Sequence, residues 1–353
     1  MRVLLAGGGT AGHINPALAI AAELKAQDPT TEFLFVGADD RMETELVPKA
    51  GYPFTSITVR GFSRKKTLKA VFHNLGTVYY AVTAGFTCGS ILKKFKPDVV
   101  VGTGGYVCGP MLRKAAKKGY PVVIHESNSY PGVTVKALAR MVNTVCIPNE
   151  EAAGRLPAGT HTVVTGNPLR PEVLHTDKAQ ARKELGIDNR PLVLSVGGSL
   201  GAAKINELVI HLLEASHKEG RYQHIHSTGK GEYEEVCEAL SEKQIPLHAD
   251  GIDVRPYIDD LPRCMAAADL VICRCGAITT SEVLAIGTPA ILIPSPNVAE
   301  NHQYYNALAL VNQGAAVCIE VHREPFWRPK RVDRMIVFVS HIGRWHNLRA
   351  VRL

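Results

Sequence analysis

Residues 273–307 read CRCGAITTSEVLAIGTPAILIPSPNVAENHQYYNA, and this stretch decides the fold class. An apolar run from Ala268 to Cys273 enters it, as a buried parallel strand would. The turn Gly276-Ala277 follows, and a helix opens over residues 279–282. A strand that feeds a helix through a glycine turn presents backbone N–H groups and the positive end of the helix dipole, which suits a diphosphate. The pattern therefore predicts an open parallel sheet with an anion site at this strand end.

A second group of polar residues follows the next strand, which we expect at Ala290 to Pro294. Asn301-His302-Gln303 lies there, where it can read the hydroxyls of a sugar, and Glu282 in the preceding helix can accept hydrogen bonds from a ribose diol. The alternative is that Thr279 and Glu282 form only a capping box. Because polar groups recur at the same edge of the predicted sheet, we favour the binding role.

The composition is that of a soluble globular protein. The chain has 353 residues, of which 46% are hydrophobic and 21% charged, enough for about two domains with their own cores. No run of about 18 apolar residues occurs, so no transmembrane helix is expected, and the N-terminus enters a strand directly rather than a signal peptide. The eight cysteines are scattered singly apart from Cys273 and Cys275, so we expect reduced thiols in a cytoplasm.

The net charge of +7 lies mainly in residues 322–353, where eight Arg and Lys stand against two acids, a balance of +6. The rest of the chain is close to neutral, so the basic pI does not indicate a nucleic-acid partner. The pairs Asp39-Asp40 and Asp259-Asp260 do not have the D-x-D spacing that would hold a metal on a diphosphate. We therefore expect helix N-termini, and no metal, to stabilise a leaving diphosphate.

The N-terminal segment from Arg2 to Gly12, RVLLAGGGTAG, repeats the pattern of strand, glycine turn and helix. Its glycines fit G-x-G-x-x-G, and Asp39 follows the next strand, so a dinucleotide-binding dehydrogenase is one candidate. His13 follows the glycines at once, at the helix start and at the ligand-binding edge of the sheet. An imidazole there suits a general base, and the alternative is a histidine that only caps or packs.

Residues 60–96 place arginines and lysines at both ends of an apolar stretch with aromatic residues. A basic collar beside such a stretch suits docking on an anionic membrane surface. The alternative is an ordinary core-facing helix with solvated lysines.

Further glycine turns and polar strand ends gather on the same predicted edge. Gly102–Tyr106 follows a strand at 98–101, and His125–Asn128 follows a strand at 120–124. In the second half, Gly197–Ala202 follows a strand at 191–196. Further strands are expected at 142–147, 161–165, 224–227, 247–249 and 316–319.

The chain therefore predicts two doubly wound α/β halves, each with an anion-binding turn after its first strand. We place a Rossmann-like domain at 1–165, a linker at 166–190 and a second Rossmann-like domain at 191–321, with an atypical basic tail at 322–353.

Seven motifs occur in order along the chain: GGGTAGHINPALAIA, VVGTGGYVCGP, IHESNSYPG, GNPLR, VGGSLGA, CRCGAITTSE and NHQYYNA. Together they resemble the MurG family, the peptidoglycan UDP-GlcNAc transferases with a two-domain GT-B fold, over about residues 1–320. The resemblance implies a hexosyltransferase without cofactor that moves GlcNAc from UDP-GlcNAc to the MurNAc 4-hydroxyl of lipid I, giving lipid II. An α-linked donor and a β-linked product require inversion, for which one base and one displacement suffice.

The resemblance also implies a location. Lipid I is MurNAc-pentapeptide on a membrane-anchored undecaprenyl diphosphate, which favours docking of residues 60–96 on the membrane. A peripheral enzyme at the cytoplasmic face of the bacterial plasma membrane is expected, acting in peptidoglycan synthesis, and hence in cell shape and division, beside other cell-wall synthesis enzymes.

The same resemblance implies roles for residues of the matching motifs. His13 is the favoured catalytic base, and Tyr106 and Glu126 are further catalytic candidates. The implied substrate-binding residues are Thr10, Ala11 and Gly12 near the donor sugar or acceptor diphosphate, Asn128 on GlcNAc, Arg170 and Ser199 on the nucleotide diphosphate, Ile258 on uracil through its backbone, Ala277, Ile278, Thr279, Thr280, Ser281 and Glu282 on phosphate and ribose, and Gln303 on GlcNAc hydroxyls.

After about Val321 the resemblance stops, and the basic tail holds both tryptophans, Trp327 and Trp345. We predict a frameshifted or spliced-on end; a basic amphipathic membrane anchor and a divergent terminal element are the alternatives. Three other functions stay open: a UDP-GlcNAc 2-epimerase of the same fold, a dehydrogenase, and a non-catalytic nucleotide-sugar-binding subunit.

Overall fold

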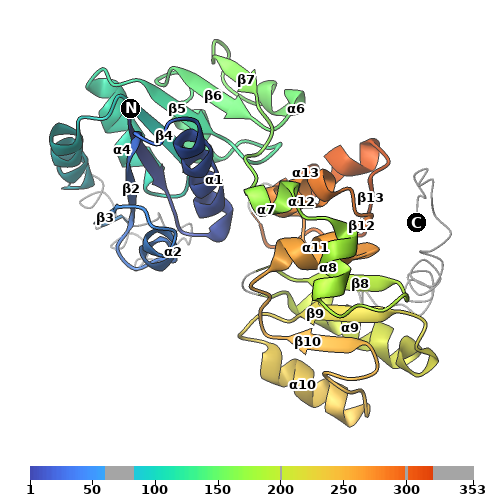
Figure 1. Ribbon diagram of the computed structural model, residues 1–353. Helices are drawn as coiled ribbons and strands as arrows, with labels where there is room; N and C mark the ends of the chain where they lie inside the picture. Colours follow the sequence, from blue (N-terminus) through green and yellow to red (C-terminus); the bar gives the residue numbers. More distant parts are fainter. Residues whose placement is uncertain (60–82, 199–200, 299–300, 321–353) are drawn as a thin grey trace, which may run out of the picture. The chain divides into compact units, whose positions relative to one another are not determined.

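The computed structural model describes residues 1–59, 83–198, 201–298 and 301–320 and divides into two compact units, Met1–Arg170 and Pro171–Leu353 (Figure 1). The division falls within the segment 166–190 that the sequence assigns to a linker. Ser199, the first part of the membrane-docking segment (60–82) and the basic tail lie outside the described residues.

Unit 1 contains, in the residues described, a seven-stranded parallel sheet in the order β3-β2-β1-β4-β5-β6-β7. The order reverses between β1 and β4, and such a switch point leaves a crevice beyond the carboxyl ends of the two strands. The strands are β1 (Arg2–Gly7), β2 (Glu32–Ala38), β3 (Phe54–Ile57), β4 (Val99–Gly104), β5 (Val122–His125), β6 (Thr144–Ile147) and β7 (Thr162–Val164). The helices are α1 (Ala11–Gln27), α2 (Glu43–Lys49), α4 (Cys108–Lys117), α5 (Val133–Leu138) and α6 (Glu150–Ala153), and residues 83–95 are also helical.

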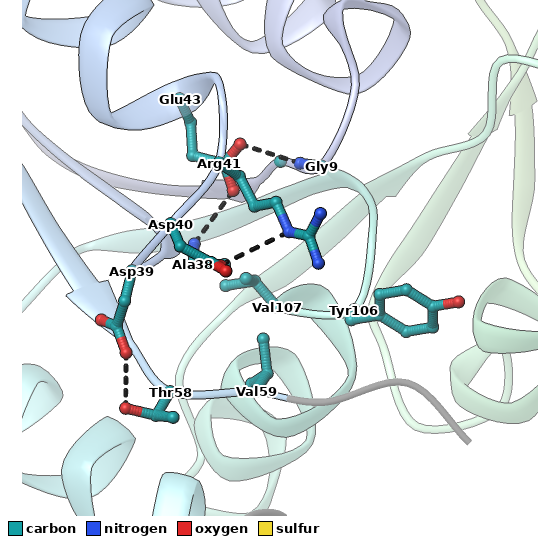
Figure 2. Close-up of a pocket in the computed structure, with 11 residues that line it drawn as sticks. Gly9, Ala38, Asp39, Asp40, Arg41, Glu43, Thr58, Val59, Tyr106 and Val107 are labelled. Atoms are coloured by element: carbon teal, nitrogen blue, oxygen red, sulfur yellow. Dashed lines mark hydrogen bonds and ion pairs between the residues drawn. The ribbon is translucent and has the colours of Figure 1, made fainter. Parts of the chain in front are cut away.

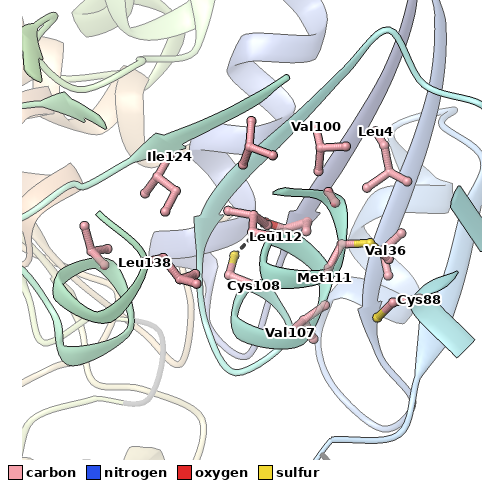
Figure 3. Packing of buried hydrophobic residues seen from close by; sticks show 14 of the residues in the cluster. Leu4, Val36, Cys88, Val100, Val107, Cys108, Met111, Leu112, Ile124 and Leu138 are labelled. Carbon is pink, nitrogen blue, oxygen red and sulfur yellow. Dashed lines mark hydrogen bonds between the residues drawn. The ribbon is translucent and has the colours of Figure 1, made fainter. Parts of the chain in front are cut away.

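Both faces of this sheet are covered, which explains the continuous apolar runs of its central strands. Alternate residues of β1 point to opposite faces: Leu5 packs with Ile14 of α1, whereas Leu4 packs in a second core with Leu112 of α4 and Val100 of β4 (Figure 3). The cores on the two faces hold β1 and β4, and therefore the loops that follow them, in fixed positions.

The helix at residues 83–95 is the described part of the segment predicted to dock on a membrane. Cys88 and Leu92 are buried in the core, whereas Lys93 is exposed and Phe86 is 75% exposed. This part therefore packs as the core-facing helix with solvated lysines that was the alternative prediction, and it also presents one exposed aromatic ring.

Unit 2 contains, within the described part of the chain, a six-stranded parallel sheet in the order β10-β9-β8-β11-β12-β13. The order reverses between β8 and β11, as it does between β1 and β4 in unit 1. The strands are β8 (Leu192–Val196), β9 (Gln223–Ser227), β10 (Ile252–Arg255), β11 (Leu270–Cys273), β12 (Ala290–Leu292) and β13 (Ala316–Cys318). The helices are α7 (Pro171–Leu174), α8 (Lys178–Glu184), α9 (Ala203–Ser216), the 3-10 helix η1 (His217–Glu219), α10 (Tyr233–Glu242), α11 (Leu261–Ala267), α12 (Ala277–Ile286) and α13 (His302–Asn312). The prediction of two doubly wound α/β halves is confirmed.

One local prediction was wrong. The strand expected at 247–249 is not formed, because this segment runs beside β10: the Val254 N–H donates to the Leu247 carbonyl at 2.8 Å, and a turn at Asp250-Gly251 precedes the strand. The capping box, which was the alternative for Thr279 and Glu282, is not formed, because α12 begins at Ala277 with Gly276 as its N-cap. Thr279 and Glu282 therefore lie inside the helix, which ends as predicted at Gly287, a residue with φ of 77°.

A chain of buried polar side chains links β8, β9 and α9. Ser195 Oγ lies 2.7 Å from both His224 Nε2 and His226 Nδ1, and His226 Nε2 lies 3.1 Å from Asn206 Oδ1. Burial disfavours an imidazolium and lowers the pKa of His224 to about 3 and that of His226 to about 4. Burial also lowers the pKa of His125, in unit 1, to about 4. These three histidines are therefore neutral in the folded protein near neutral pH.

We expect the protein to lose stability as the pH falls from about 7.5 to 5. The unfolded chain takes up protons on these histidines near their ordinary pKa of about 6.5, so their contribution is present above that pH and is lost as the pH falls toward the folded values. For a folded pKa of about 4, the loss at pH 5 is about 2 kcal/mol per histidine. Urea unfolding at several pH values measures it. An unfolding midpoint that stays constant over this pH range would contradict the assignment. So would a pH dependence of the midpoint that disappears in His248→Gln, the control at an exposed histidine.

Candidate active site

The glycine loop between β1 and α1 turns some of its amides inward and others outward. The Gly8 N–H donates to the Gly104 carbonyl at 3.3 Å, and the Gly9 N–H donates to the Glu43 carboxylate at 2.9 Å. The next amides, at Thr10, Ala11 and Gly12, belong to the N-cap and first turn of α1, where a helix offers no preceding carbonyl. These amides and the N-terminus of a 17-residue helix have the geometry of an anion-binding end.

A second glycine loop, after β4, packs against the first. Gly104 and Gly105 have φ of 115° and 87°, a backbone region that suits only glycine. A Cβ on Gly105 would lie 2.3 Å from the Gly8 carbonyl oxygen, and a Cβ on Gly104 would lie 2.3 Å from His13 Nδ1. The close approach of the two loops and of the His13 ring therefore requires both glycines.

Two contacts with Thr103 hold His13 beside this second loop. Its Nδ1 lies 3.1 Å from the Thr103 carbonyl oxygen, and the Thr103 hydroxyl donates to the His13 carbonyl at 2.7 Å. Because a carbonyl oxygen only accepts, the neutral ring carries its proton on Nδ1 and its lone pair on Nε2. This tautomer suits Nε2 to accept a proton.

The loop after β5 is organised by a buried carboxylate. Glu126 is 5% exposed; its Oε1 accepts the backbone N–H of Asn128 at 2.8 Å and the Asn128 Nδ2 at 3.0 Å, and its Oε2 accepts the Gly132 N–H at 2.7 Å. The Asn167 Nδ2 donates to the Ser127 carbonyl at 3.1 Å, which ties the segment before Arg170 to this loop. Both Glu126 oxygens thus hold the backbone in place.

A cavity of about 520 Å³ lies in unit 1 beside the glycine loop (Figure 2). Tyr106 lines it and is 69% exposed. Thr58 donates to Asp39 at 2.5 Å, and the Arg41 guanidinium lies 3.4 Å from Asp40. The other lining residues are Gly8 and Gly9 of the glycine loop, Ala38 and Glu43 at the ends of β2 and α2, Val59 after β3, and Val107 before α4.

In unit 2, the segment that decides the fold has the geometry of a second anion-binding end. β11 leads through Arg274, Cys275 and Gly276 into the ten-residue α12. The hydroxyls of Thr280 and Ser281 both donate to the Ala277 carbonyl at 2.9 Å, inside the helix. Ala277, Ile278 and Thr279 form the first turn, and Glu282 is 5% exposed.

Polar side chains tie this end to the two segments that follow it. The Arg274 Nη1 donates to the carbonyls of Ile293 and Pro294 at 3.1 and 3.0 Å, and the Asn306 Nδ2 donates to the Cys275 carbonyl at 3.1 Å. Burial lowers the pKa of Arg274. Sequence analysis assigned no role to Arg274 or Asn306, although both lie inside motifs that it singled out.

The structure also describes Gln303 and Ile258, two further residues that were predicted to bind substrate. Gln303 lies in the first turn of α13, where its Oε1 accepts the Ser295 N–H at 2.8 Å. Ile258 follows β10 and is 5% exposed, with its side chain in the core below the sheet edge. In the glycine turn after β8, Gly201 has φ of 83°, and a Cβ there would lie 2.4 Å from the Thr228 carbonyl oxygen.

No helix in the described part of the chain is long and apolar enough to cross a membrane. Nor do the described residues include a group of three His, Cys, Asp or Glu side chains placed to share a metal ion.

Two family models match the chain. The glycosyltransferase family 28 N-terminal domain matches residues 3–147, and the glycosyltransferase family 28 C-terminal domain matches residues 192–336, which extends into the basic tail. The two parallel-sheet units agree with these matches: the chain is a glycosyltransferase of the GT-B fold.

Two relatives of the chain define a narrower family within this class. The UDP-N-acetylglucosamine--N-acetylmuramyl-(pentapeptide) pyrophosphoryl-undecaprenol N-acetylglucosamine transferase of Caldanaerobacter subterraneus is 46% identical over 89% of this chain and 85% of that protein. The protein of the same name from Acetivibrio thermocellus is 44% identical over 90% of this chain and 85% of its own length. The chain belongs to this family of transferases, the MurG family.

Solved structures agree with this assignment. The crystal structure of Acinetobacter baumannii MurG superposes with a TM-score of 0.71 at 29% identity, covering 98% of this chain and 95% of that one. A UDP-GlcNAc 2-epimerase from Neisseria meningitidis, bound to UDP-GlcNAc, has a TM-score of 0.62 at 14% identity over 99% of this chain and 95% of its own, which shows a shared fold alone.

Proposed function

We propose that the chain transfers GlcNAc from UDP-GlcNAc to the 4-hydroxyl of MurNAc in undecaprenyl-diphosphate-linked MurNAc-pentapeptide, with inversion at C1. The names of its relatives support the two substrates. The observation that carries the proposal is His13, whose Nδ1 contacts the Thr103 carbonyl at 3.1 Å at the anion-binding end of α1. This arrangement supports a role for His13 as a base beside a site for the acceptor diphosphate.

In the proposed step, His13 Nε2 takes the proton of the MurNAc hydroxyl while the hydroxyl oxygen bonds to C1 of GlcNAc. The bond between C1 and the oxygen of the UDP β-phosphate breaks, and its electron pair leaves with UDP. One displacement converts the α-linkage of the donor into a β-linkage. Because Glu126 already accepts three hydrogen bonds, we assign it to positioning the Asn128 loop, and we assign Tyr106 to the wall of the acceptor site.

We assign unit 1 to the acceptor and unit 2 to the donor. The amides of Thr10 to Gly12 would bind the acceptor diphosphate, and the amides at the start of α12 would stabilise the charge that develops on UDP. On the donor, Arg170 and Ser199 would contact the diphosphate, Glu282 the ribose diol, Ile258 the uracil through its backbone, and Asn128 and Gln303 the GlcNAc hydroxyls. The core packing of the Ile258 side chain supports a backbone role.

We further propose that unit 1 docks on the cytoplasmic face of the plasma membrane, where an undecaprenyl-linked acceptor resides. The exposed ring of Phe86 and the exposed lysines at 93, 94 and 96 support a surface that contacts anionic lipid. Association with other cell-wall synthesis enzymes, and a part in cell shape and division, would follow from this location.

Ligand-induced stabilisation tests the donor assignment. UDP and UDP-GlcNAc should raise the unfolding temperature, since a ligand at about 100 times its Kd adds about 2.7 kcal/mol to stability, whereas NAD should not. Incubation with UDP-GlcNAc and lipid I should then give lipid II. Stabilisation by NAD alone would support a dehydrogenase, a 2-epimer formed without acceptor would support an epimerase, and UDP binding without transfer would support a non-catalytic subunit.

A further inference from the structure

Glu43 is a buried carboxylate that the proposed chemistry does not use. It is the first residue of α2, and its side chain is 0% exposed. Its Oε2 accepts the Gly9 N–H at 2.9 Å, and its Oε1 accepts the Ala38 N–H at 3.0 Å (Figure 2). One carboxylate therefore joins the glycine loop after β1 to the end of β2.

Two glycines leave room for the side chain of Glu43. A Cβ on Gly8 would lie 2.0 Å from Glu43 Oε1, and a Cβ on Gly37 would lie 2.4 Å from Glu43 Cγ. Any other residue at either position would displace the carboxylate. The glycine at position 8 is thus required by Glu43, not only by a ligand that approaches the loop from outside.

The contact decides which amides of the loop face a ligand. With the Gly9 N–H turned inward to Glu43 and the Gly8 N–H bonded to the Gly104 carbonyl, an anion is left with the amides of Thr10, Ala11 and Gly12. Residue 13, the proposed base, follows directly on this segment. A loop that lost the contact with Glu43 could turn the Gly8–Gly9 peptide outward and move the start of α1.

We propose that Glu43 is a positioning residue for the acceptor diphosphate, which holds the glycine loop so that the amides at positions 10 to 12 converge on it. This inference rests on the assignment of the acceptor to unit 1. The negative charge of Glu43 lies behind the loop, where two backbone N–H groups donate to it. The outward face of the loop therefore keeps the positive character of the helix end.

The variant Glu43→Gln tests the proposal. Glutamine has nearly the same shape, but its amide offers one acceptor oxygen and one NH₂ donor, so one of the two N–H groups loses its acceptor and meets a donor. We expect the KM for a short-chain lipid I analogue to rise about 10- to 100-fold, the range for a lost charge-assisted hydrogen bond. The KM for UDP-GlcNAc should change by less than about twofold, because Glu43 bonds to Gly9 and Ala38, neither of which we assign to the donor.

Asp98→Asn is the matched control. Asp98 Oδ2 accepts the Arg2 N–H at 2.7 Å, so this carboxylate also binds a backbone amide of unit 1, at the opposite end of β1. Asp98→Asn should lower the unfolding temperature without changing the KM for the lipid I analogue or the KM for UDP-GlcNAc. Equal KM values in Glu43→Gln and wild type, or equal effects of both variants on the acceptor KM, would overturn the proposal. A wild-type protein that makes no lipid II would instead refute the proposed function.

Amide hydrogen exchange in the wild-type protein gives a second measurement that does not depend on a variant folding. The Gly9 amide should exchange slowly with or without ligand. The amides at 10 to 12 should exchange fast and slow down when the lipid I analogue is added. Fast exchange at Gly9, or protection of Gly9 only when the analogue is bound, would overturn the role given to Glu43.

Discussion

His13→Ala is expected to lower turnover by about 100- to 10,000-fold, the usual contribution of a general base. The substitution removes the only group for which we propose proton transfer, while every residue that we assign to the donor is unchanged. The KM or Kd for UDP-GlcNAc should therefore stay close to the wild-type value. Steady-state transfer to lipid I and titration calorimetry with UDP-GlcNAc measure the two effects separately.

The control for this prediction is His161→Ala. His161 also places its Nδ1 on a backbone carbonyl, that of Asn143, at 3.2 Å, but it is exposed and directly precedes β7, away from the glycine loop. Its removal should leave turnover unchanged. The pH profile adds a second criterion, since loss of His13 should remove the fall in turnover on the acidic side. Equal turnover in His13→Ala and wild type would exclude His13 as the base.

Gly104→Ala is expected to lower turnover nearly as much as the loss of His13 itself. The added Cβ would lie 2.3 Å from His13 Nδ1, so the ring must leave the Thr103 carbonyl that selects its tautomer. The φ of 115° at Gly104 also strains any L-residue, at a cost of about 1–3 kcal/mol. Turnover and unfolding temperature should therefore both fall.

Gly119→Ala separates the two causes. Gly119 has φ of 79° and nothing within 4 Å of an added Cβ, so alanine there brings backbone strain without displacing a side chain. It should lower stability and leave turnover intact. If Gly104 acts through His13, the double variant His13→Ala, Gly104→Ala should be no less active than His13→Ala alone. A Gly104→Ala enzyme as active as Gly119→Ala would show that the ring position does not matter.

Much of the framework could be predicted because its signals are local. Buried parallel strands appear as apolar runs, and the turns after β1, β4, β8 and β11 each show a glycine before a helix. The errors concern short strands whose limits a short stretch of sequence does not determine. β10 lies at Ile252–Arg255 rather than at 247–249 because the turn at Asp250-Gly251 sets the register, and β3 at Phe54–Ile57, a short edge strand with two polar residues, was not expected.

By itself, the sequence determined two doubly wound units, a histidine at the first glycine loop, and membership of a transferase family through motifs spread over the chain. Only the tertiary structure decided which groups hold that site: Thr103 bonds His13 from 90 residues away, and Glu43 bonds Gly9 from 34 residues away. Neither contact has a periodicity or a motif spacing. Both arise because parallel strands bring distant loops to one edge, where a carbonyl and a carboxylate find the groups they can bind.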